Sequence, residues 1–580
     1  GGNGDDPPRG GAFMIHPALA VDLVGTPFSV RGSYYSVRRE ERARALLLRT
    51  VHGDAGNGRL MEIELAGSSD LVTEVQPGLL TASTGESAIS LAFVEAGGAI
   101  LRVERGEVVL HLDVADAYDT VIADGDRSWR FVRSGVRRNY SIQVDGGQAV
   151  LETAWDSVRH TSAMLRVMAG LGGATVRIEE FVSSPSGALQ GREVGEVAAA
   201  GDWDFEEWLG YYGGAARAGA PDSAVRLAAY VTWSALVPAG GLLTRESMLM
   251  SKNNMTHIWS WDHCFNALAL WREPEAALDQ LLCLFDHQDA GGALPDHVDD
   301  SRAQWNFVKL PVHGWTIGYL MDRGNVARLY EPLERWTRWW FAHRDYSGAG
   351  TPAYNHGNDS GWDNATIFTD GVAVEGPDLL AFLALQMHVL ARMARVLGQE
   401  SEAAGWEARA RVTIDRMLER FWRDGRFVAR ESLTQREISS DSLITLMPLV
   451  LGDQLPREVF EACVARLLEA HLTEHGLATE PVASEFYEGD GYWRGPIWAP
   501  STMLIADGLR RGGQDELALG LASLFAQLCV RSGMAENFDA VTGEGLRDRS
   551  MTWTASVFLA MTDPQGPFSA GGSSQSDSSG

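Results

Sequence analysis

Residues 198–221 read AAAGDWDFEEWLGYYGGAARAGAP, and the spacing of apolar residues differs on the two sides of this stretch. Before it, apolar residues recur mainly at every second position, which is typical of half-buried strands. After Pro221 they recur at every third and fourth position, which is typical of amphipathic helices. We therefore expect a β-sandwich domain over residues 13–197, a linker with one short helix over residues 198–220, and a helical domain over residues 221–564.

Alternating apolar residues predict the strands of the first domain. Residues 108–114 place four aliphatic side chains on one face, and residues 174–178 alternate in the same way. Residues 142–144 lead into Asp145-Gly146-Gly147, and aliphatic residues resume at Val150, so a hairpin is predicted here. Short strands separated by Gly and Asp indicate an antiparallel β-sandwich.

The helical spacing predicts helices over residues 222–237, 378–397, 401–422, 457–472, 516–530 and 551–561, and another that begins at Pro274. Dividing the helical domain among twelve helices leaves about 29 residues for each helix and its loop, which suits a ring of paired helices. This length argument favours an (α/α)6 barrel with a pocket at one end. The flanks, residues 1–12 and 565–580, are rich in Gly, Ser and Asp, and we expect them to be disordered.

The composition limits the class of partner. The chain has 580 residues, a net charge of −28 at neutral pH and a sequence pI near 4.9. Such a surface repels nucleic acid and anionic membranes, so neither is an expected partner and a small polar substrate is favoured. The 19 tryptophans favour large helix interfaces or a carbohydrate site, where flat rings pack on sugars. The oligomeric state stays open.

The four cysteines have no paired spacing, which predicts neither a zinc site nor a disulfide framework. They are Cys264, Cys283, Cys463 and Cys529. No run of 18 apolar residues occurs, and the N-terminus has no charged-then-apolar signal pattern. A reducing, cytoplasmic location is therefore expected.

Four loops of the helical half carry tryptophans and carboxylates outside the apolar repeats. They are residues 257–265, 294–315, 360–366 and 492–498, with residues 534–539 following further along the chain. Each loop alone is a weak signal, because Trp-rich loops more often pack than bind. Together they offer stacking faces for pyranose rings and separated carboxylates, and an apolar wall raises a carboxyl pKa. This combination favours a carbohydrate site.

The motifs in these loops resemble a known family. WSWDHCFNALAL, SGWDNAT, YWRGPIWAP and ENFDAVTGEG are similar, in the same order, to the motif series of glycoside hydrolase family 63. That family contains processing α-glucosidases and, in bacteria, mannosylglycerate and glucosylglycerate hydrolases. The resemblance covers roughly residues 245–560 and implies an (α/α)6 barrel, while the β-rich half only loosely resembles the N-terminal sandwich of some bacterial members.

The resemblance implies a role for each matching residue. The Asp of the SGxDN motif, here Asp363, is the general acid, and the Glu that opens the ENF-type motif, here Glu536, is the general base. The Asp of WSWD and the tryptophans nearby hold the sugar, and the tryptophans of WRGPIW line the same pocket. The expected substrate contacts are Trp259, Trp261, Asp262, Lys309, His313, Gly361, Trp362, Asn364, Trp493, Arg494 and Trp498.

Two positions depart from the family pattern. Many members read WESGxDN, whereas this chain reads NDSGWDN, so an aromatic residue is replaced by Asn358. The Gln that often opens the QPPVH segment is replaced by Lys309. Both departures fall where the substrate is gripped, so they bear on the identity of the substrate more than on the reaction.

The chemistry agrees with the implied roles. A glycosidic oxygen is a poor leaving group until it is protonated, and in an inverting enzyme a base activates water on the opposite face, with the carboxyls roughly 6.5–9.5 Å apart. Asp363 and Glu536 lie in different loops, which allows them to flank a pocket. We expect an inverting, α-glucosidase-like hydrolase that acts on a disaccharide, an oligosaccharide or a glucosyl conjugate.

Alternatives stay open for several residues. Glu485, Glu488 and Asp539 are other candidates for the base, and Asp262 could cap the helix that follows it. The histidines lack the spacing of a metal site, so no metal or cofactor is expected. The acidic residues 296–300 could bind a structural Ca²⁺ ion, although a solvated loop is favoured.

Two other classes of function remain in play. A sugar epimerase or isomerase on an (α/α)6 barrel would use histidines for proton transfer and would exchange deuterium into a free sugar. A non-catalytic carbohydrate-binding protein would bind a glycan tightly without turnover. A phosphorylase, a closer variant, would need a phosphate site, and no compact basic loop in the sequence suggests one.

Overall fold

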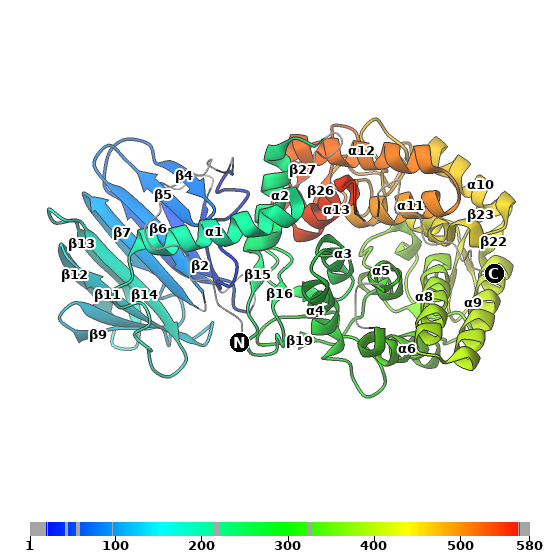
Figure 1. Cartoon of the computed structure of the whole chain (residues 1–580), viewed down its shortest axis with the longest axis horizontal. Coiled ribbons are helices and arrows are strands. Elements are labelled where there is room, and N and C mark those ends of the chain that lie inside the picture. The colour runs from blue at the N-terminus through cyan, green and yellow to red at the C-terminus, as the bar shows by residue number, and fades with distance from the viewer. Residues whose placement is uncertain are drawn as a thin grey trace. The chain divides into compact units, whose positions relative to one another are not determined.

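The computed structural model describes residues 19, 21–40, 44–53, 58–95, 97–213, 220–321, 326–566 and 568 (Figure 1). The chain divides into two compact units. The first comprises Gly1–Gly213, Ala229–Pro238 and Ser251–Thr256, and the second comprises Gly214–Ala228, Ala239–Met250 and His257–Gly580. The single boundary expected near residue 220 is therefore too simple, because two later segments belong to the first unit. The flanks expected to be disordered lie outside the described residues, except for residues 565, 566 and 568.

Among the described residues, fourteen strands of the first unit, all before residue 182, form its sheets. They are β1 (Tyr35–Arg39), β2 (Ala45–Thr50), β3 (Arg59–Leu65), β4 (Val72–Gln76), β5 (Leu79–Ser83), β6 (Ala88–Val94), β7 (Gly98–Arg105), β8 (Glu107–Leu112), β9 (Thr120–Gly125), β10 (Ser128–Arg133), β11 (Arg138–Asp145), β12 (Gln148–Trp155), β13 (His160–Met168) and β14 (Ala174–Phe181).

These strands form two antiparallel sheets, in the orders β1-β2-β3-β8-β13-β12 and β4-β5-β6-β7-β14-β11-β10-β9. Tyr35 of β1 packs against Phe93 of β6 and Tyr140 of β11, so the two sheets share one core. The alternating residues 108–112 and 174–178 lie in β8 and β14. The predicted antiparallel sheets in this half are confirmed.

The predicted hairpin around residues 145–147 is wrong. β11 pairs with β10 and β14, whereas β12 pairs with β13 in the other sheet. Gly146 and Gly147 have φ of +73° and +60°, so the turn is present, but it carries the chain from one sheet to the other. Alternation predicts that a strand exists and where it turns, but it does not say which strand becomes the partner.

Helix α1 (Val194–Gly213) takes the place of most of the predicted linker. It packs on β5, β6 and β7 (Figure 1), with Val197 and Ala198 in the shared apolar core. Asp202 accepts a hydrogen bond from the Gly78 N–H at 2.8 Å. A Cβ at Gly78 would lie 2.1 Å from the Ala198 carbonyl oxygen, so glycine allows the helix to approach the sheet. Glycines and acids in this stretch masked the helical spacing.

The second unit is helical. Its helices are α3 (Asp262–Ala269), α4 (Pro274–Phe285), α5 (His313–Leu320), α6 (Val326–His343), α7 (Gly357–Ser360), α8 (Pro377–Val396), α9 (Glu400–Phe421), α10 (Arg457–Arg466), α11 (Ala499–Arg511), α12 (Asp515–Ser532) and α13 (Thr552–Thr562), with the shorter turns η2 (Thr366–Phe368), η3 (Leu443–Gln454) and η4 (Leu467–His471). Helix α2 (Asp222–Ser234) is divided between the two units. Residues 457–472, expected as one helix, form α10 and η4.

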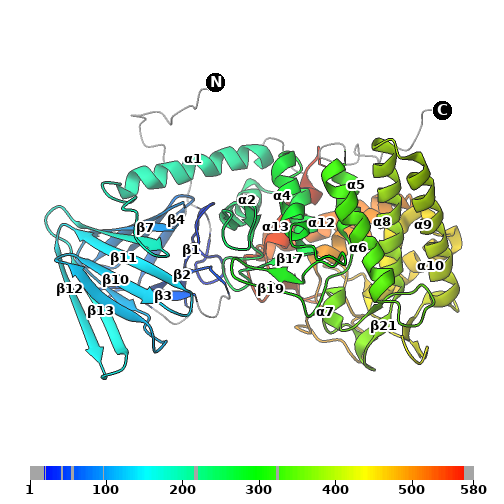
Figure 2. The same cartoon turned by 90° about the horizontal axis from the view of Figure 1, so that it is seen from below.

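Six helical segments of the second unit contact one another in a closed cycle: α3 with α5, α5 with α8, α8 with η3, η3 with α11, α11 with α13, and α13 with α3. Other helices pack on members of this cycle, as α9 does on α8, which lie side by side in Figure 2. By length and composition α8 could cross a membrane, but most of it is buried inside this unit, as the core helix of a folded domain would be. The predicted helical character of this half is confirmed.

Short strands also lie between and beside the helices; the first of them, β15, belongs to the first unit and the others to the second. They are β15 (Leu236–Val237), β16 (Ser247–Met248), β17 (Ile258–Trp259), β18 (His297–Val298), β19 (Ala303–Gln304), β20 (Ala353–Tyr354), β21 (Val374–Glu375), β22 (Trp422–Arg423), β23 (Arg426–Phe427), β24 (Ala429–Glu431), β25 (Glu437–Ile438), β26 (Asn537–Phe538) and β27 (Gly545–Leu546).

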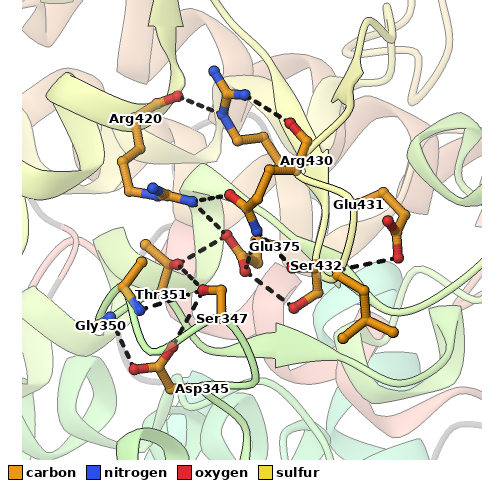
Figure 3. A network of polar contacts seen from close by, with 12 residues as sticks. Asp345, Ser347, Gly350, Thr351, Glu375, Arg420, Arg430, Glu431 and Ser432 are labelled. Atoms are coloured by element: carbon orange, nitrogen blue, oxygen red, sulfur yellow. Dashed lines mark hydrogen bonds and ion pairs between the residues drawn. The ribbon is translucent and has the colours of Figure 1, made fainter.

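A buried carboxylate fixes the small sheet β20-β21-β24-β25. Glu375 of β21 is fully buried and pairs with Arg420 at 3.2 Å (Figure 3). It also accepts hydrogen bonds from the Thr351 hydroxyl at 2.8 Å and the Ser432 hydroxyl at 3.0 Å. A buried carboxylate with this set of partners has its hydrogen bonds satisfied. Its removal would leave the buried donors without an acceptor, which destabilises the fold. This sheet matters because the loop after β20 leads to Asp363.

We expect Glu375→Ala to lower the free energy of unfolding by roughly 3 kcal/mol, because it leaves the buried end of Arg420 and two hydroxyls without their acceptor. Urea denaturation followed by far-UV circular dichroism measures the change. Glu437→Ala, which removes an exposed carboxylate from neighbouring β25, is the matched control and should change little. Equal midpoints for the two variants would contradict the structural role of Glu375.

Candidate active site

The loop after β20 carries Asp363, and two glycines determine its path. Helix α7 is followed by Gly361, whose φ is +73°, and a Cβ there would lie 2.6 Å from the ring of Trp261. A Cβ at Gly357 would lie 2.0 Å from the Asp363 carbonyl oxygen. Both sites therefore require glycine. Gly361, predicted as a substrate contact, closes the loop against Trp261 and so helps to position Asp363.

Asp359 anchors the same loop from inside the protein. Its fully buried carboxylate pairs with Arg344 at 2.7 Å and accepts the Val308 N–H at 3.0 Å. Val308 directly precedes Lys309 in the sequence. One carboxylate therefore holds together the loop that carries Asp363 and the segment that carries Lys309.

Lys309 is 3% exposed and lies against Asp296, with Nζ 2.9 Å from Oδ1. It donates hydrogen bonds to the Asn358 carbonyl oxygen at 2.7 Å and to the Asn358 side-chain oxygen. The two positions that depart from the motif pattern thus contact each other. The other oxygen of Asp296 lies 3.0 Å from His297 Nδ1. Protein atoms engage the Lys309 ammonium, so a direct contact with substrate stays a prediction.

Asp262 begins helix α3 and is 2% exposed. Its Oδ2 has no hydrogen-bond partner within the described part of the chain, and no side chain caps this helix. The alternative role as a helix cap is therefore wrong. Burial raises the pKa of Asp262 well above its ordinary value; the Lys309 ammonium opposes this rise, and the charges of Asp296 and Asp363 add to it. An unpartnered, buried carboxyl of this kind suits contact with a ligand hydroxyl.

Glu536 lies one residue before β26 and is 3% exposed. Its N–H donates to the Asp548 carbonyl oxygen at 2.7 Å, which ties it to the strand region of β27. Burial, reinforced by the charge of Asp548, raises the pKa of Glu536 to about 7, and Asp363 adds to the rise while Arg547 opposes it. Glu536 is therefore within electrostatic range of Asp363.

Burial likewise raises the pKa of Asp363. The Lys309 ammonium and His356 oppose the rise, and the charge of Asp296 adds to it. Two carboxyls with raised pKa values, brought from loops far apart in the sequence, are candidates for proton exchange with a ligand. This is the arrangement that general acid–base chemistry requires.

Tyr492 lies among these acids, although the sequence did not single it out. Burial raises the pKa of its phenol, and the charges of Asp363, Glu536 and Asp262 add to the rise, so the phenol is within electrostatic range of all three. Its φ is +63°, an outlier for an aromatic residue. The only signal for Tyr492 was its place in the YWRGPIW segment, because a left-handed backbone at tyrosine has no pattern in the sequence.

Asn364 holds the loop of Tyr492 on both sides. Its side-chain oxygen accepts the Trp493 N–H at 3.0 Å, and its side-chain nitrogen donates to the Gly491 carbonyl oxygen at 2.9 Å. The Asn364 carbonyl oxygen accepts a hydrogen bond from Arg494 Nε at 2.7 Å. Asn364 and Arg494, both predicted to contact substrate, therefore bond to each other and join the Asp363 loop to the Tyr492 loop.

The predicted tryptophans form a buried cluster. Trp493 and Trp498 stack with ring centroids 4.1 Å apart and planes 3° from parallel, and Trp362 covers Trp493 at 4.5 Å. Trp261 also contacts Trp493, and all four side chains are buried. They pack against one another and present no open face. Trp259 differs, since it is only half-buried beside His297, and it fits a stacking role better than the others.

Other predicted residues lie apart from the acids. His313 is buried between Phe285 and Trp336, and burial lowers its pKa to about 3, so it is a neutral packing residue. Among the rival bases, Glu485 and Glu488 are exposed, and Asp539 accepts two N–H groups of its own turn.

The acidic loop at residues 296–300 is not the solvated loop that the sequence favoured. Asp296, Asp299 and Asp300 are all buried, and Asp299 lies 3.2 Å from His257. No group of three or more His, Cys, Asp or Glu side chains suited to a metal ion occurs among the residues that the structure describes.

The similarity in sequence to a known family covers residues 255–554, in the helical half. A family model described as the mannosylglycerate hydrolase MGH1-like glycoside hydrolase domain matches residues 255–554. The mannosylglycerate hydrolase of Rubrobacter radiotolerans is 24% identical over 400 residues, which is 52% of this chain and 90% of that protein.

Two solved structures share the fold. The family 63 mannosylglycerate hydrolase from Thermus thermophilus, in complex with glucose, is 20% identical with a TM-score of 0.51, over 58% of this chain and 99% of that chain. A bacterial glucoamylase complexed with acarbose is 11% identical with a TM-score of 0.63, over 94% of this chain and 95% of that chain. The second likeness therefore extends over the β-sheets as well as the helices.

The raised pKa of Glu536 makes a prediction about stability. Because the folded state holds this proton more tightly than the unfolded state, ionisation of Glu536 destabilises the fold as the pH rises from about 4.5 through about 7. Glu536→Gln removes that cost, which amounts to roughly 3 kcal/mol above pH 8. The variant should therefore melt at a higher temperature than the parent at pH 8, and at nearly the same temperature at pH 4.5. An advantage that does not grow with pH would contradict the burial of an ionisable Glu536.

Proposed function

Because the chain belongs to glycoside hydrolase family 63, we propose that it is an inverting glycoside hydrolase that cleaves an α-glycosidic bond. Asp363 acts as the general acid and Glu536 as the general base. The observation that carries this proposal is their convergence: Glu536 is buried and Asp363 half-buried, both have raised pKa values, the charge of Asp363 adds to the rise at Glu536, and both charges act on the Tyr492 phenol.

The proposed reaction uses each carboxyl once. Asp363 gives its proton to the glycosidic oxygen as the bond from that oxygen to the anomeric carbon breaks. Glu536 takes a proton from a water molecule whose oxygen bonds to the anomeric carbon on the opposite face, which inverts the configuration. Asp363 ends ionised and Glu536 ends protonated, and exchange with solvent restores both. Asp262, whose Oδ2 has no protein partner in the described structure, is suited to accept a hydrogen bond from a sugar hydroxyl.

We extend the proposal to the architecture that presents these loops. The closed cycle of contacts through α3, α5, α8, η3, α11 and α13 supports an inner ring of six helices, as in an (α/α)6 barrel. Asp262 stands at the start of α3, and the Tyr492 loop leads into α11. Segments before the inner helices would then gather at one end, where a pocket is expected.

The proposed substrate is an α-glucoside, either an oligosaccharide or a glucosyl conjugate. Similarity to mannosylglycerate hydrolases brings α-linked glycerate glycosides into the same set. Screening α-glucosides and α-mannosides, including the two glycerate conjugates, by NMR identifies the substrate and the anomer released. A β-sugar as first product supports the inverting mechanism, and an α-sugar contradicts it.

An epimerase or a non-catalytic binding protein is the alternative. His313 and His263 are buried, and burial lowers the pKa of each to about 3, so neither suits proton transfer near neutral pH. Deuterium incorporation into a free sugar would favour an epimerase. Glycan binding without release of a sugar would favour a binding protein.

We expect Asp363→Asn and Glu536→Gln each to lower kcat at least about 100-fold on the natural substrate, because each removes a proton-transfer step. An α-glycosyl fluoride separates the two roles: fluoride leaves without protonation, so Asp363→Asn should retain far more activity on it than Glu536→Gln. Steady-state kinetics on both substrates make the comparison.

The rival acids supply the matched controls. Glu488→Gln and Asp539→Asn should keep activity within a few fold, because the structure places Glu488 in solvent and Asp539 in its own turn. Loss of activity in either of these variants, with activity retained in Glu536→Gln, would overturn the assignment of the base. Activity should also fall below about pH 7, as Glu536 becomes protonated.

A further inference from the structure

The Lys309–Asp296 ion pair contacts Asn358, in the loop that carries the proposed acid, and has no role in the reaction described above. Nζ of Lys309 and Oδ1 of Asp296 are 2.9 Å apart, and each side chain is 4% exposed. The pair joins two segments, since Asp296 directly precedes β18 and Lys309 follows β19. Such a pair is too enclosed to be screened by solvent in the way that a surface pair is.

Protein contacts hold both partners in place. Lys309 donates to the carbonyl and side-chain oxygens of Asn358, and Asn358 Nδ2 lies 3.5 Å from the second oxygen of Asp296. His297 Nδ1 lies 3.0 Å from that same oxygen. Burial works against ionisation of Asp296, but the contacts with His297 and Lys309 outweigh it, so the pKa of Asp296 is lowered. The pair is therefore a fixed positive charge next to a fixed negative one.

Both charges act on the proton of Asp363, and they act in opposite directions. The ammonium favours the ionised form of Asp363, and the carboxylate favours the protonated form. The charged and titratable groups that face Asp363 are Lys309, Asp296, His356, Asp262, Tyr492 and Glu536. Of these, Lys309 and Asp296 are the ones that the structure holds as an ion pair.

We propose that Lys309 and Asp296 are positioning residues that act as one unit: their fixed, opposite charges, both in contact with Asn358 of the loop that carries Asp363, set the alkaline limit of activity. Each charge alone would shift the protonation of Asp363, and the two shifts would have opposite signs. Asp296 without Lys309 would add an unbalanced anion beside Asp262 and Asp363. Lys309 without Asp296 would draw Asp363 into its ionised form, which cannot protonate a leaving group. This inference rests on the proposed role of Asp363.

Opposite shifts in the pH profile test the proposal. With a natural O-glycoside, Lys309→Gln should move the alkaline limb of kcat up by about 1 pH unit, because Asp296 then favours protonated Asp363 unopposed. Asp296→Asn should move the same limb down by about 1 pH unit, because Lys309 then acts alone. The double variant should return close to the parent, and Lys309→Arg, which keeps the charge, should not move the limb.

Surface charges provide the matched controls. Arg338 and Glu334 form a partly exposed pair on α6, so Arg338→Gln and Glu334→Gln make the same changes in net charge as the two test variants. Neither should move the limb. The inference would be overturned if the alkaline limb of the kcat profile stayed fixed, or moved in the same direction, in Lys309→Gln and Asp296→Asn. A pair with a purely structural role would lower kcat without such opposite shifts.

The experiment also distinguishes this inference from the proposed function. A glycosyl fluoride needs no proton from Asp363. The pH profile measured with this substrate should therefore not shift in Lys309→Gln, Asp296→Asn, the double variant or Lys309→Arg. If the parent hydrolyses no glycoside, the proposed function fails. If the parent hydrolyses a glycoside with a bell-shaped profile and the limbs do not separate, only the role of the ion pair fails. Thermal melts check that each variant is folded, and Asp296→Asn with the double variant suffices if Lys309→Gln unfolds.

Discussion

The buried pair between Asp359 and Arg344 is the interaction on which the geometry of the site depends. Asp359 has no exposed surface, and its carboxylate accepts the N–H of Val308 as well as pairing with Arg344. It lies four residues before the proposed acid and one hydrogen bond away from the segment of Lys309. The same carboxylate therefore places the residue that carries the proton and the ion pair that acts on that proton.

Burial of the three acids of the site lowers the stability of the folded state. Asp262, Asp363 and Glu536 are each made harder to ionise by burial, and their charges repel one another. One ammonium, that of Lys309, lies close to two of them. A site of this kind is less stable than a neutral core, and the surrounding packing must offset the difference. The tryptophan cluster and the Glu375 network supply dense surroundings of that sort.

Much of the fold could be predicted from spacing alone, because apolar periodicity reflects which face of an element is buried. The strands β8 and β14 and the helices α4, α8, α9 and α12 follow their predicted ranges closely. Pairing could not be predicted in this way: the turn at Gly146 and Gly147 looks like a hairpin, yet it joins two sheets. The length of helix α1 was missed, because Gly201 stands where an apolar side chain would mark the stripe, against Gly78 of the turn between β4 and β5.

For the site, too, some residues could be predicted from the sequence and others could not. Motifs singled out Asp363, Glu536 and Asp262, because carboxylates beside tryptophans and outside the apolar repeats are visible in the sequence. The same motifs suggested open sugar platforms at Trp493 and Trp498, whereas burial shows these rings packed face to face. Tyr492 was missed, because its position depends on a backbone angle and on three hydrogen bonds of Asn364 that only the folded chain contains.

The stack of Trp493 on Trp498 has an optical consequence. Two indole rings 4.1 Å apart and nearly parallel, with Trp261, Trp362 and Trp553 at their edges, are close enough for their electronic transitions to couple. Coupled indoles in a fixed geometry give near-ultraviolet circular dichroism that is lost when tertiary packing loosens. The protein therefore contains a pair of coupled indoles in the loop of Tyr492. Near-ultraviolet circular dichroism of this pair should report whether the loops around Asp363 are ordered.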